Sequence, residues 1–301
     1  MKRKLIRQGK SALTVTLPTK WAEKLALKPG DEIEVEEKDS RLELSAKKEP
    51  ELLKTEIDTT ALGHFNKVFL NYLYKAGYDE ILFKFDNIEV FKQIQERVSM
   101  LIGYAIVDQK ENSCLVKCVS ETKPEDFDIM LRKTLLVMVD MSESIIDVIK
   151  KEQHNRLKEI RALEGTNNTF TDFCMRSIKK WGYKEPKTSL FIYCILRDLE
   201  KLGDIYKYIC DYLYNNKTKL SGKTIEVFEF TNDYLRKFYE LFYRFDSKKA
   251  KYLNDKRYEK VIELNKLMEN VPKKEILVIH YLANIIILIY EFLGPYYEMT
   301  I

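Results

Sequence analysis

The chain has few of the residues that most often build catalytic or metal centres. Its 301 residues include three histidines and five cysteines. The histidines, His64, His154 and His280, are far apart in the sequence, and the cysteines show no paired Cys-x-x-Cys spacing. No phosphate-binding P-loop, Gly-x-Ser-x-Gly or His-Glu-x-x-His motif occurs. No nucleophile or general base constellation is visible, so the sequence favours a protein that is not an enzyme.

The chain also lacks a strong excess of one charge. Its net charge is +4, with 33% charged and 45% hydrophobic residues, which is typical of a soluble globular protein. Affinity for nucleic acid would therefore have to come from a local basic patch. The basic start leads into an alternating strand and not into an apolar run, so we expect no secretory signal. Together with the odd number of cysteines, this predicts a reduced, cytoplasmic protein.

The first fifty residues have the clearest local pattern. Leu13, Val15 and Leu17 alternate with Thr14 and Thr16, which predicts a half-buried strand. Pro18 cannot continue a strand ladder but suits the first turn of a helix. Fifty residues bury little core alone, so we expect this unit to complete its core with a second copy.

A helix and a hairpin are predicted after this strand. The helix is expected over 21–26, and Lys28-Pro-Gly-Asp31 supplies a turn. Strands over 31–37 and 41–46 then form the hairpin. One face of it is expected to carry four apolar side chains, namely Ile33, Val35, Leu42 and Leu44.

Charge is divided within this segment. Residues 1–28 contain eight basic residues and one acidic residue, whereas residues 29–50 contain four basic and eight acidic residues. Such a basic start is often a solvated, disordered tail. Here it is joined without a linker to a strand and a turn of defined chemistry, which favours an anion-binding surface that a dimer would double.

The first segment resembles the AbrB/SpoVT family of swapped-hairpin DNA-binding domains. The resemblance covers residues 3–48 and rests on Gly9-Lys-Ser-Ala-Leu-Thr-Val-Thr-Leu-Pro18, Leu27-Lys-Pro-Gly-Asp-Glu-Ile-Glu-Val35 and Arg41-Leu-Glu-Leu44. It implies that two chains interleave their hairpins into one dimeric β-barrel that binds DNA. The implied DNA-contacting residues are Arg3, Lys4, Arg7 and Lys10, with Ser11, Thr14 and Thr16 donating hydrogen bonds to the DNA backbone. The arginines are the better candidates for reading bases.

Residues 51–122 predict a small α/β segment. Helices are expected over 58–76 and 87–100, with Gly77 ending the first of them, and a strand over 79–85. A hairpin follows over 102–108 and 113–119. No convergent polar constellation is visible, so a spacer or dimer-supporting role is preferred over a ligand-binding module.

Residues 123–301 predict an all-α domain. Breaks at glycine, proline and asparagine separate stretches with helical periodicity, and short connections favour an antiparallel six-helix bundle. The expected helices run over 124–151, 154–181, 186–215, 223–246, 248–270 and 273–293. The last is apolar enough to suggest a membrane span, but three polar residues, His280, Asn284 and Glu291, interrupt it, so a buried helix is expected instead.

The stretch from Arg197 to Ile209 resembles the signature helix of the PhoU family, with Glu200 and Asp204 as its acidic pair. The resemblance implies a six-helix bundle of two three-helix repeats, with iron or another divalent cation bound by the acidic residues. The apolar frame recurs in the last helix: Leu282, Ile285, Leu288 and Phe292 correspond to Leu199, Leu202, Ile205 and Ile209. The acidic pair does not recur, since Ala283 and Ile287 replace it. A solvated acidic face balanced by Arg197 and Lys207 is the alternative to a metal site.

Together these patterns predict a homodimeric, DNA-binding transcriptional regulator of phosphate uptake and phosphate homeostasis. The alternative is an adapter that binds phosphate transporter or sensor-kinase subunits, with the N-terminal barrel serving for dimerisation. A metal-dependent hydrolase is disfavoured because no general base or nucleophile constellation accompanies Glu200 and Asp204. An antitoxin fits the first segment but not the large bundle that follows it.

Overall fold

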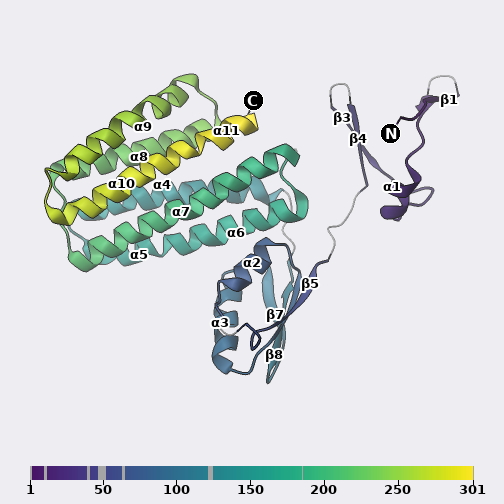
Figure 1. Ribbon diagram of the computed structural model, residues 1–301, viewed down its shortest axis with the longest axis horizontal. Helices are drawn as coiled ribbons and strands as arrows, with labels where there is room; N and C mark the ends of the chain where they lie inside the picture. Colours follow the sequence, from purple (N-terminus) through teal and green to yellow (C-terminus); the bar gives the residue numbers. More distant parts are fainter. Residues whose placement is uncertain are drawn as a thin grey trace. The chain divides into compact units, whose positions relative to one another are not determined.

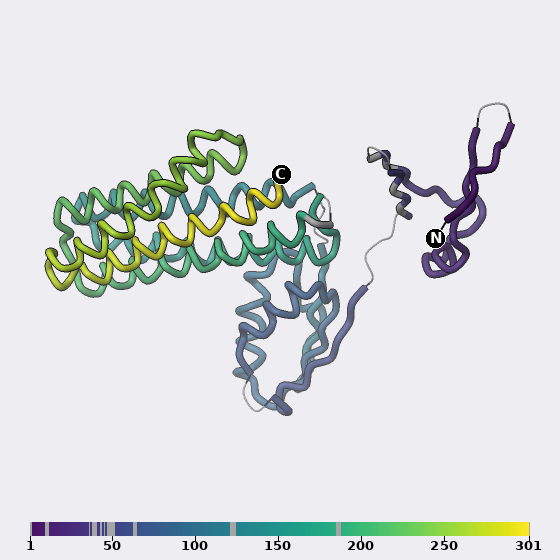
Figure 2. The backbone as a smooth tube through the Cα atoms, turned by 45° about the horizontal axis from the view of Figure 1, so that its top comes forward, coloured from purple at the N-terminus to yellow at the C-terminus, as the bar shows by residue number. Residues whose placement is uncertain are grey.

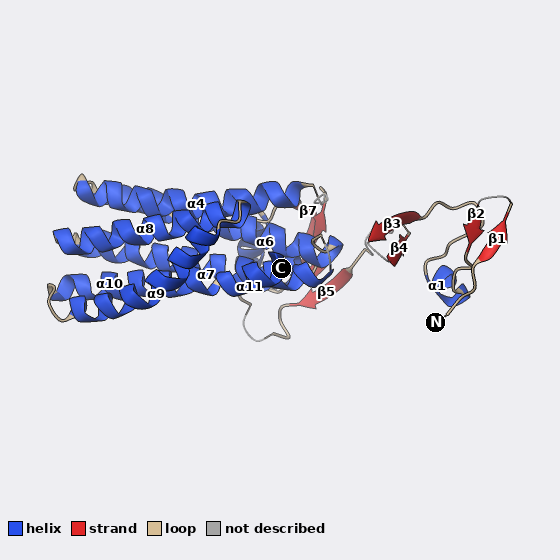
Figure 3. Ribbon diagram, turned by 90° about the horizontal axis from the view of Figure 1, so that it is seen from above, coloured by secondary structure: helices blue, strands red, loops and turns tan. Residues whose placement is uncertain are grey.

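The computed structural model describes residues 2–9, 12–38, 41–46, 52–62, 65–120, 125–184 and 186–300. The chain divides into two compact units, Met1–Glu51 and Leu52–Ile301. Figure 3 distinguishes the strands and the single short helix of the first unit from the predominantly helical second unit.

Over its described residues, the first unit contains two hairpins and one short helix. Strands β1 (Ile6–Gln8) and β2 (Ala12–Thr14) pair antiparallel, as do β3 (Glu34–Lys38) and β4 (Arg41–Ser45). Helix α1 (Thr19–Lys24) lies between the hairpins in the sequence. These elements agree with the predicted order of strand, helix and hairpin.

Helix α1 begins two residues before its predicted start. The carbonyl of Pro18 accepts hydrogen bonds from the backbone N–H groups of Trp21 (2.9 Å) and Ala22 (3.0 Å), so the helix starts directly after the proline. Ala26 adopts a left-handed conformation with φ of 53°, which ends the helix earlier than periodicity suggested. The predicted turn is present: the Lys28 N–H donates to the Asp31 carboxylate at 2.7 Å, and Gly30 has φ of +100°.

The second unit begins with a four-stranded sheet whose strand order is β5-β6-β8-β7 (Figure 1). Its strands are β5 (Lys54–Asp58), β6 (Glu80–Lys84), β7 (Tyr104–Lys110) and β8 (Ser113–Cys118). β5 pairs parallel with β6, and the remaining pairs are antiparallel. Helices α2 (Phe69–Lys75) and α3 (Ile88–Val98) cover one face, against which the side chains of Ile81, Phe83, Cys114 and Val116 are buried.

The prediction of a helix over 58–76 was wrong in its first half. Residues 54–58 form β5, and α2 begins only at Phe69. In β5 the half-buried Thr55 and Ile57 alternate with exposed charged residues, so the strand is stabilised by its ladder with β6 and shows little apolar pattern. Gly77 follows α2 with φ of +89°, as a helix-ending glycine should.

The remaining helices form a bundle whose long members lie side by side (Figures 1 and 2). They follow the predicted ranges closely: α4 (Asp126–Lys150), α6 (Leu163–Trp181), α7 (Pro186–Asn216), α8 (Gly222–Tyr243), α9 (Ser247–Met268) and α10 (Lys273–Glu291). The helical region is therefore confirmed, while the PhoU-type arrangement of two repeats stays a prediction. The predicted division into domains over 1–50, 51–122 and 123–301 also stays a prediction.

One predicted helix is divided, and another is followed directly by a further helix. The stretch expected over 154–181 contains the 3₁₀ turn η1 (His154–Arg156), α5 (Leu157–Arg161) and then α6. The chain also continues as α11 (Leu293–Thr300) beyond the break expected at Gly294-Pro295. Pro295 lies in the first turn of α11, where its missing N–H costs no helical hydrogen bond.

The bundle and the sheet with its two helices each have an apolar core of their own. The bundle core includes all four residues of the α10 frame, and Leu199, Leu202 and Ile209 of α7, whereas Ile205 is half-buried. Over the described residues one helical stretch, Lys273–Thr300, is long and apolar enough to cross a membrane, and 56% of its most apolar window is buried. Because α10 packs against α7, α8 and α9, its apolar character matches a core helix.

Candidate nucleic-acid interface

The β1–β2 hairpin presents the residues predicted to contact DNA. Its register pairs Ile6 with Thr14, Arg7 with Leu13, and Gln8 with Ala12. Successive residues of a strand point to opposite faces, so Arg7 and Leu13 share one face of the hairpin. Gly9 at the end of β1 has φ of +71°, which glycine adopts without strain.

The predicted contact residues lie on or beside this hairpin. Arg3 and Lys4 precede β1 and are exposed, Arg7 is exposed within β1, and Thr16 is exposed after β2. The Thr14 hydroxyl instead donates to the backbone oxygen of Ile6 at 3.2 Å, so in this structure it serves the hairpin itself. Two further predicted residues, Lys10 and Ser11, lie outside the described residues.

The first unit exposes apolar side chains that would ordinarily form a core. None of its side chains described between residues 2 and 46 is buried. The exposed set comprises Leu5 (67%), Ile6 (54%), Leu13 (64%), Val15 (46%), Val35 (56%) and Leu42 (67%). Burying one such side chain stabilises a structure by about 1.5–3 kcal/mol. A single copy of this unit therefore lacks the burial that would hold its hairpins together.

The second hairpin has part of the face predicted for it, since Ile33 lies before β3 and Glu37 shares the face. Val35 lies opposite Leu44, and Glu37 lies opposite Leu42, which places Val35, Leu42 and Leu44 on one side of the β3–β4 ladder. This apolar face and the exposed side chains of β1 and β2 give the unit two surfaces that require a partner. The basic residues are concentrated before residue 29, so DNA contacts are expected on the first hairpin and not on the acidic second one.

The acidic pair of α7 is engaged in ion pairs. The Glu200 carboxylate lies 3.8 Å from the ammonium of Lys75, and Asp204 pairs with Lys207. Lys207 also lies 3.0 Å from Glu164 of α6. These carboxylates raise the pKa of Lys207 more than its partial burial lowers it. Lys75 and Lys207 therefore compensate Glu200 and Asp204. Of the two cations expected in this role, Lys207 takes part, whereas Arg197 pairs with the neighbouring Asp198 at 3.4 Å.

Metal binding by Glu200 and Asp204 stays a prediction. In the part of the chain that the structure describes, no three His, Cys, Asp or Glu side chains gather into a potential metal site. The two carboxylates of the predicted acidic pair each have a lysine partner. We therefore derive no chemistry from a bound metal.

A buried polar cluster that the sequence did not reveal joins α2 and α3 to α6 and α7. Its centre is Asp172, whose carboxylate accepts a hydrogen bond from the Asn71 amide at 2.8 Å. Lys75 lies 3.2 Å and Arg97 lies 3.6 Å from the same carboxylate. Burial raises the pKa of Asp172 to about 6, against the lowering influence of Lys75 and Arg97. The sequence signal that could have revealed this cluster is Asp172, a charged residue within the largely apolar stretch from Phe170 to Met175.

A second buried charge lies one turn further along α6. Arg176 donates hydrogen bonds to the backbone oxygens of Tyr74 (3.0 Å) and Tyr78 (2.8 Å). Its guanidinium carbon lies 5.1 Å from the ring centroids of both Tyr74 and Tyr104. The Asp79 carboxylate completes the cluster and forms ion pairs with the Arg176 guanidinium and the Lys180 ammonium, each at 2.6 Å. These contacts fix the α/β segment to the bundle.

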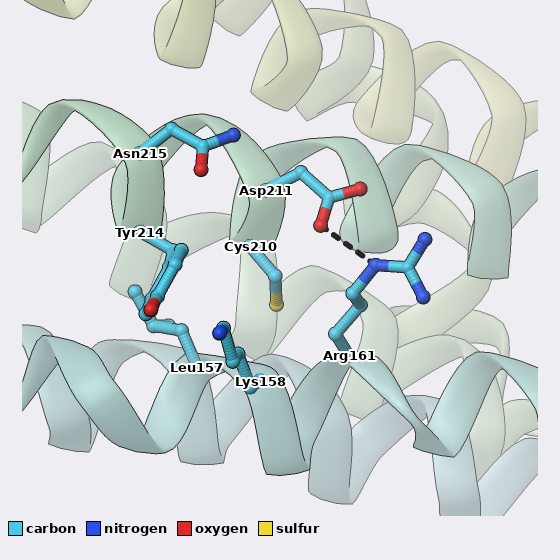
Figure 4. Close-up of a pocket in the computed structure, with 7 residues that line it drawn as sticks. All are labelled: Leu157, Lys158, Arg161, Cys210, Asp211, Tyr214 and Asn215. Carbon is cyan, nitrogen blue, oxygen red and sulfur yellow. Dashed lines mark hydrogen bonds and ion pairs between the residues drawn. The ribbon is translucent and has the colours of Figure 1, made fainter.

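A cavity of about 440 Å³ between α5 and α7 contains another pair of basic residues (Figure 4). Arg161 points toward Asp211 and donates from Nε at 2.6 Å, and the Lys158 ammonium lies 4.5 Å from the Tyr214 ring centroid. Burial raises the pKa of Cys210 to about 12, so its thiol stays neutral at neutral pH. The ion pair connects α5 to α7 and leaves the cavity with only one uncompensated lysine.

The comparisons with known proteins agree with the first unit. Residues 6–52 match the family model described as antidote-toxin recognition MazE, a bacterial antitoxin. The matched range contains both hairpins and α1, so the chain begins with a MazE/AbrB-like domain. No curated protein and no solved structure matches the chain.

Proposed function

We propose that this protein is a dimeric, DNA-binding transcriptional regulator. The observation that carries the proposal is the first unit, in which exposed apolar residues and exposed basic residues lie on or beside one short hairpin. A second copy would bury the apolar side chains and bring two sets of basic residues together. Arg3, Lys4 and Arg7 then bind DNA phosphates or groove edges, and Lys10, Ser11, Thr14 and Thr16 are proposed to add contacts to the DNA backbone. The similarity to a MazE/AbrB-like domain supports this assignment.

The bundle is proposed to act as the sensory or protein-interaction part, in control of phosphate uptake and phosphate homeostasis. This finer assignment is supported by the resemblance of the Arg197–Ile209 stretch to the PhoU signature helix. The burial of corresponding apolar residues in α7 and α10 is compatible with it. A signal received by the bundle would change DNA affinity only if it binds the two states of the dimer unequally.

The competing proposal is an adapter in which the first unit only dimerises. The bundle would then bind a phosphate transporter or sensor-kinase subunit. The exposed apolar face of β3 and β4 would serve both proposals equally, so it does not decide between them. The exposed basic residues Arg3, Lys4 and Arg7 favour the regulator proposal, because an adapter that only dimerises through this unit does not need them.

DNA binding by the full-length protein, measured by fluorescence anisotropy against salt, tests the proposal. A dimer making about 6–10 phosphate contacts should lose about 10³–10⁵ in affinity between 50 and 200 mM salt. Replacing Arg3 and Arg7 together by alanine should abolish binding while the helical content is unchanged. The matched control replaces Arg156 and Arg236 of the bundle by alanine, which removes the same charge and should preserve binding.

The phosphate assignment needs a separate measurement. Wild-type protein should prefer its own promoter or phosphate-transport promoters over random DNA at the same salt concentration. Equal affinity for all of these sequences would remove the regulator proposal and leave the adapter. A preference for promoters unrelated to phosphate would keep the DNA-binding regulator and remove only its phosphate role.

A further inference from the structure

A cavity of about 500 Å³ lies where the α/β segment meets the bundle. Tyr72 and Lys75 of α2 line one side, Met175, Ile178 and Lys179 of α6 line another, and Tyr193 of α7 completes it. Three helices of the second unit therefore contribute to one site. Its volume lies within the range of about 300–1,000 Å³ that small-molecule sites occupy.

The cavity exposes aromatic surface. Tyr72 is 59% exposed and Tyr193 is 39% exposed, whereas Met175, which also lines the cavity, is buried. Exposed tyrosines beside an apolar floor offer a planar ligand faces on which to stack. Their rings lie on different helices, α2 and α7, so the ligand would contact both parts of the second unit.

The charge of the cavity is positive on one side. The ammonium of Lys75 is held by Asp172 at 3.2 Å and by Glu200 at 3.8 Å, and it lies 5.6 Å from the Tyr72 ring centroid. Lys179 forms no ion pair with any carboxylate among residues 52–62, 65–120, 125–184 and 186–300. An anion entering the cavity would therefore meet one compensated and one uncompensated ammonium group.

We propose that this cavity binds a planar aromatic anion of the nucleoside monophosphate class. The base stacks on Tyr72 and Tyr193 over the apolar floor, and Lys179 binds the phosphate. Stacking on an aromatic side chain contributes about 1–3 kcal/mol per base, which a phosphate alone would not gain. Glu200 then has a positioning role together with Asp172, because both carboxylates hold the ammonium of Lys75, which lines the cavity.

The basic cavity between α5 and α7 makes a poorer site for such a ligand. There Asp211 already compensates Arg161, and Lys158 covers the ring of Tyr214. In the proposed site both tyrosines are partly exposed and an ammonium is available. Partly exposed tyrosine rings beside an ammonium group without a carboxylate partner among the described residues are the combination that favours an aromatic anion.

Isothermal titration calorimetry of the full-length protein tests the proposal with AMP, GMP, CMP and UMP as probes. At least one nucleotide should bind with a dissociation constant below about 1 mM. Tyr193→Ala and Lys179→Ala should each weaken that binding about tenfold. The matched controls, Tyr258→Ala and Lys248→Ala on α9, replace exposed residues of the same types and should leave affinity unchanged.

Adenosine and inorganic phosphate separate the two halves of the site. AMP should bind at least about tenfold more tightly than either of them. Binding of none of the four nucleotides would overturn the proposal, as would equal affinities for AMP and phosphate or for AMP and adenosine. Unchanged affinity in both cavity variants would place the nucleotide elsewhere and overturn it equally. The measurement requires no DNA, so its outcome is independent of the proposed regulator function.

Discussion

Arg176 of α6 and Asp79, which directly precedes β6, form an ion pair of 2.6 Å inside the second unit. The two side chains are 2% and 4% exposed, so both charges are removed from water. The Asp79 carboxylate also accepts hydrogen bonds from Lys180 at 2.6 Å and from the backbone N–H of Leu53 at 2.8 Å. One carboxylate thus joins the start of the sheet to a helix of the bundle.

Replacing Arg176 by alanine should destabilise the second unit strongly. The change leaves the buried Asp79 with Lys180 as its remaining cation and opens the space between Tyr74 and Tyr104. Removing one partner of a buried ion pair typically costs about 3–5 kcal/mol. Urea unfolding followed by circular dichroism should show this loss. Arg236→Ala, which breaks an exposed pair with Glu143, should cost less than about 1 kcal/mol and provides the control.

Gly203 and Gly165 should respond oppositely to alanine. A Cβ atom at Gly203 of α7 would lie 2.8 Å from the Asn167 amide nitrogen, which donates to the Leu199 backbone oxygen. Gly203→Ala should therefore destabilise the bundle by about 1–3 kcal/mol despite better helix propensity. A Cβ at Gly165 of α6 would meet nothing within 4 Å, so Gly165→Ala should stabilise by up to about 1 kcal/mol. Equal effects in thermal unfolding would contradict the close α6–α7 packing.

Periodicity and helix breakers predicted the bundle well because its helices are long and their apolar frames are regular. The apolar frame of α10 was visible in the sequence and is buried in the structure. The ion pair of Arg176 and Asp79 was not, because 97 residues separate its members and single charges show no partner preference. Strand β5 was missed for a related reason, since its stability comes from pairing with β6 and not from its own residues.

The candidate DNA-binding site was predictable only in part. Exposed Arg3, Lys4 and Arg7 follow from the local pattern and the basic start. The hydrogen bond of the Thr14 hydroxyl within the hairpin could not be predicted, because it depends on the strand register that places Ile6 opposite Thr14. The ion pairs of Glu200 depend on α2, a helix whose start the sequence placed eleven residues too early.

Asp172 should make the stability of the second unit depend on pH. Burial raises the pKa of this carboxyl from 3.8 to about 6, while Lys75, Arg97 and Asn71 face it and Glu200 lies near. The folded state therefore binds more protons than the unfolded state between these values, and this contribution to stability is lost as pH rises through the window. A shift of this size corresponds to about 3 kcal/mol.

The variant Asp172→Asn isolates that contribution, because its amide stays neutral. The quantity to compare is the free energy of unfolding of the variant minus that of wild type. This difference should be larger at pH 7 than at pH 4.5 by about 2–3 kcal/mol. Urea unfolding at the two pH values measures the difference, and carboxyl groups common to both proteins cancel. A difference of the opposite sign would mean that the pairing with Lys75 outweighs burial.

Leu42→Glu should dissociate the dimer expected from the first unit. Leu42 lies on β4 opposite Glu37 and is 67% exposed in the single copy, so its burial requires a partner. A carboxylate there would have to lose its hydration in the dimer without a compensating cation, which costs several kcal/mol for a group of this kind. Sedimentation velocity should therefore show a monomer, and DNA affinity should fall because the two basic hairpins no longer act together.

The control Leu190→Glu changes a residue of the same type, 65% exposed on α7 in the second unit, and should leave both the sedimentation coefficient and DNA binding unchanged. A dimer that survives Leu42→Glu but not Leu190→Glu would assign self-association to the bundle instead of the hairpins.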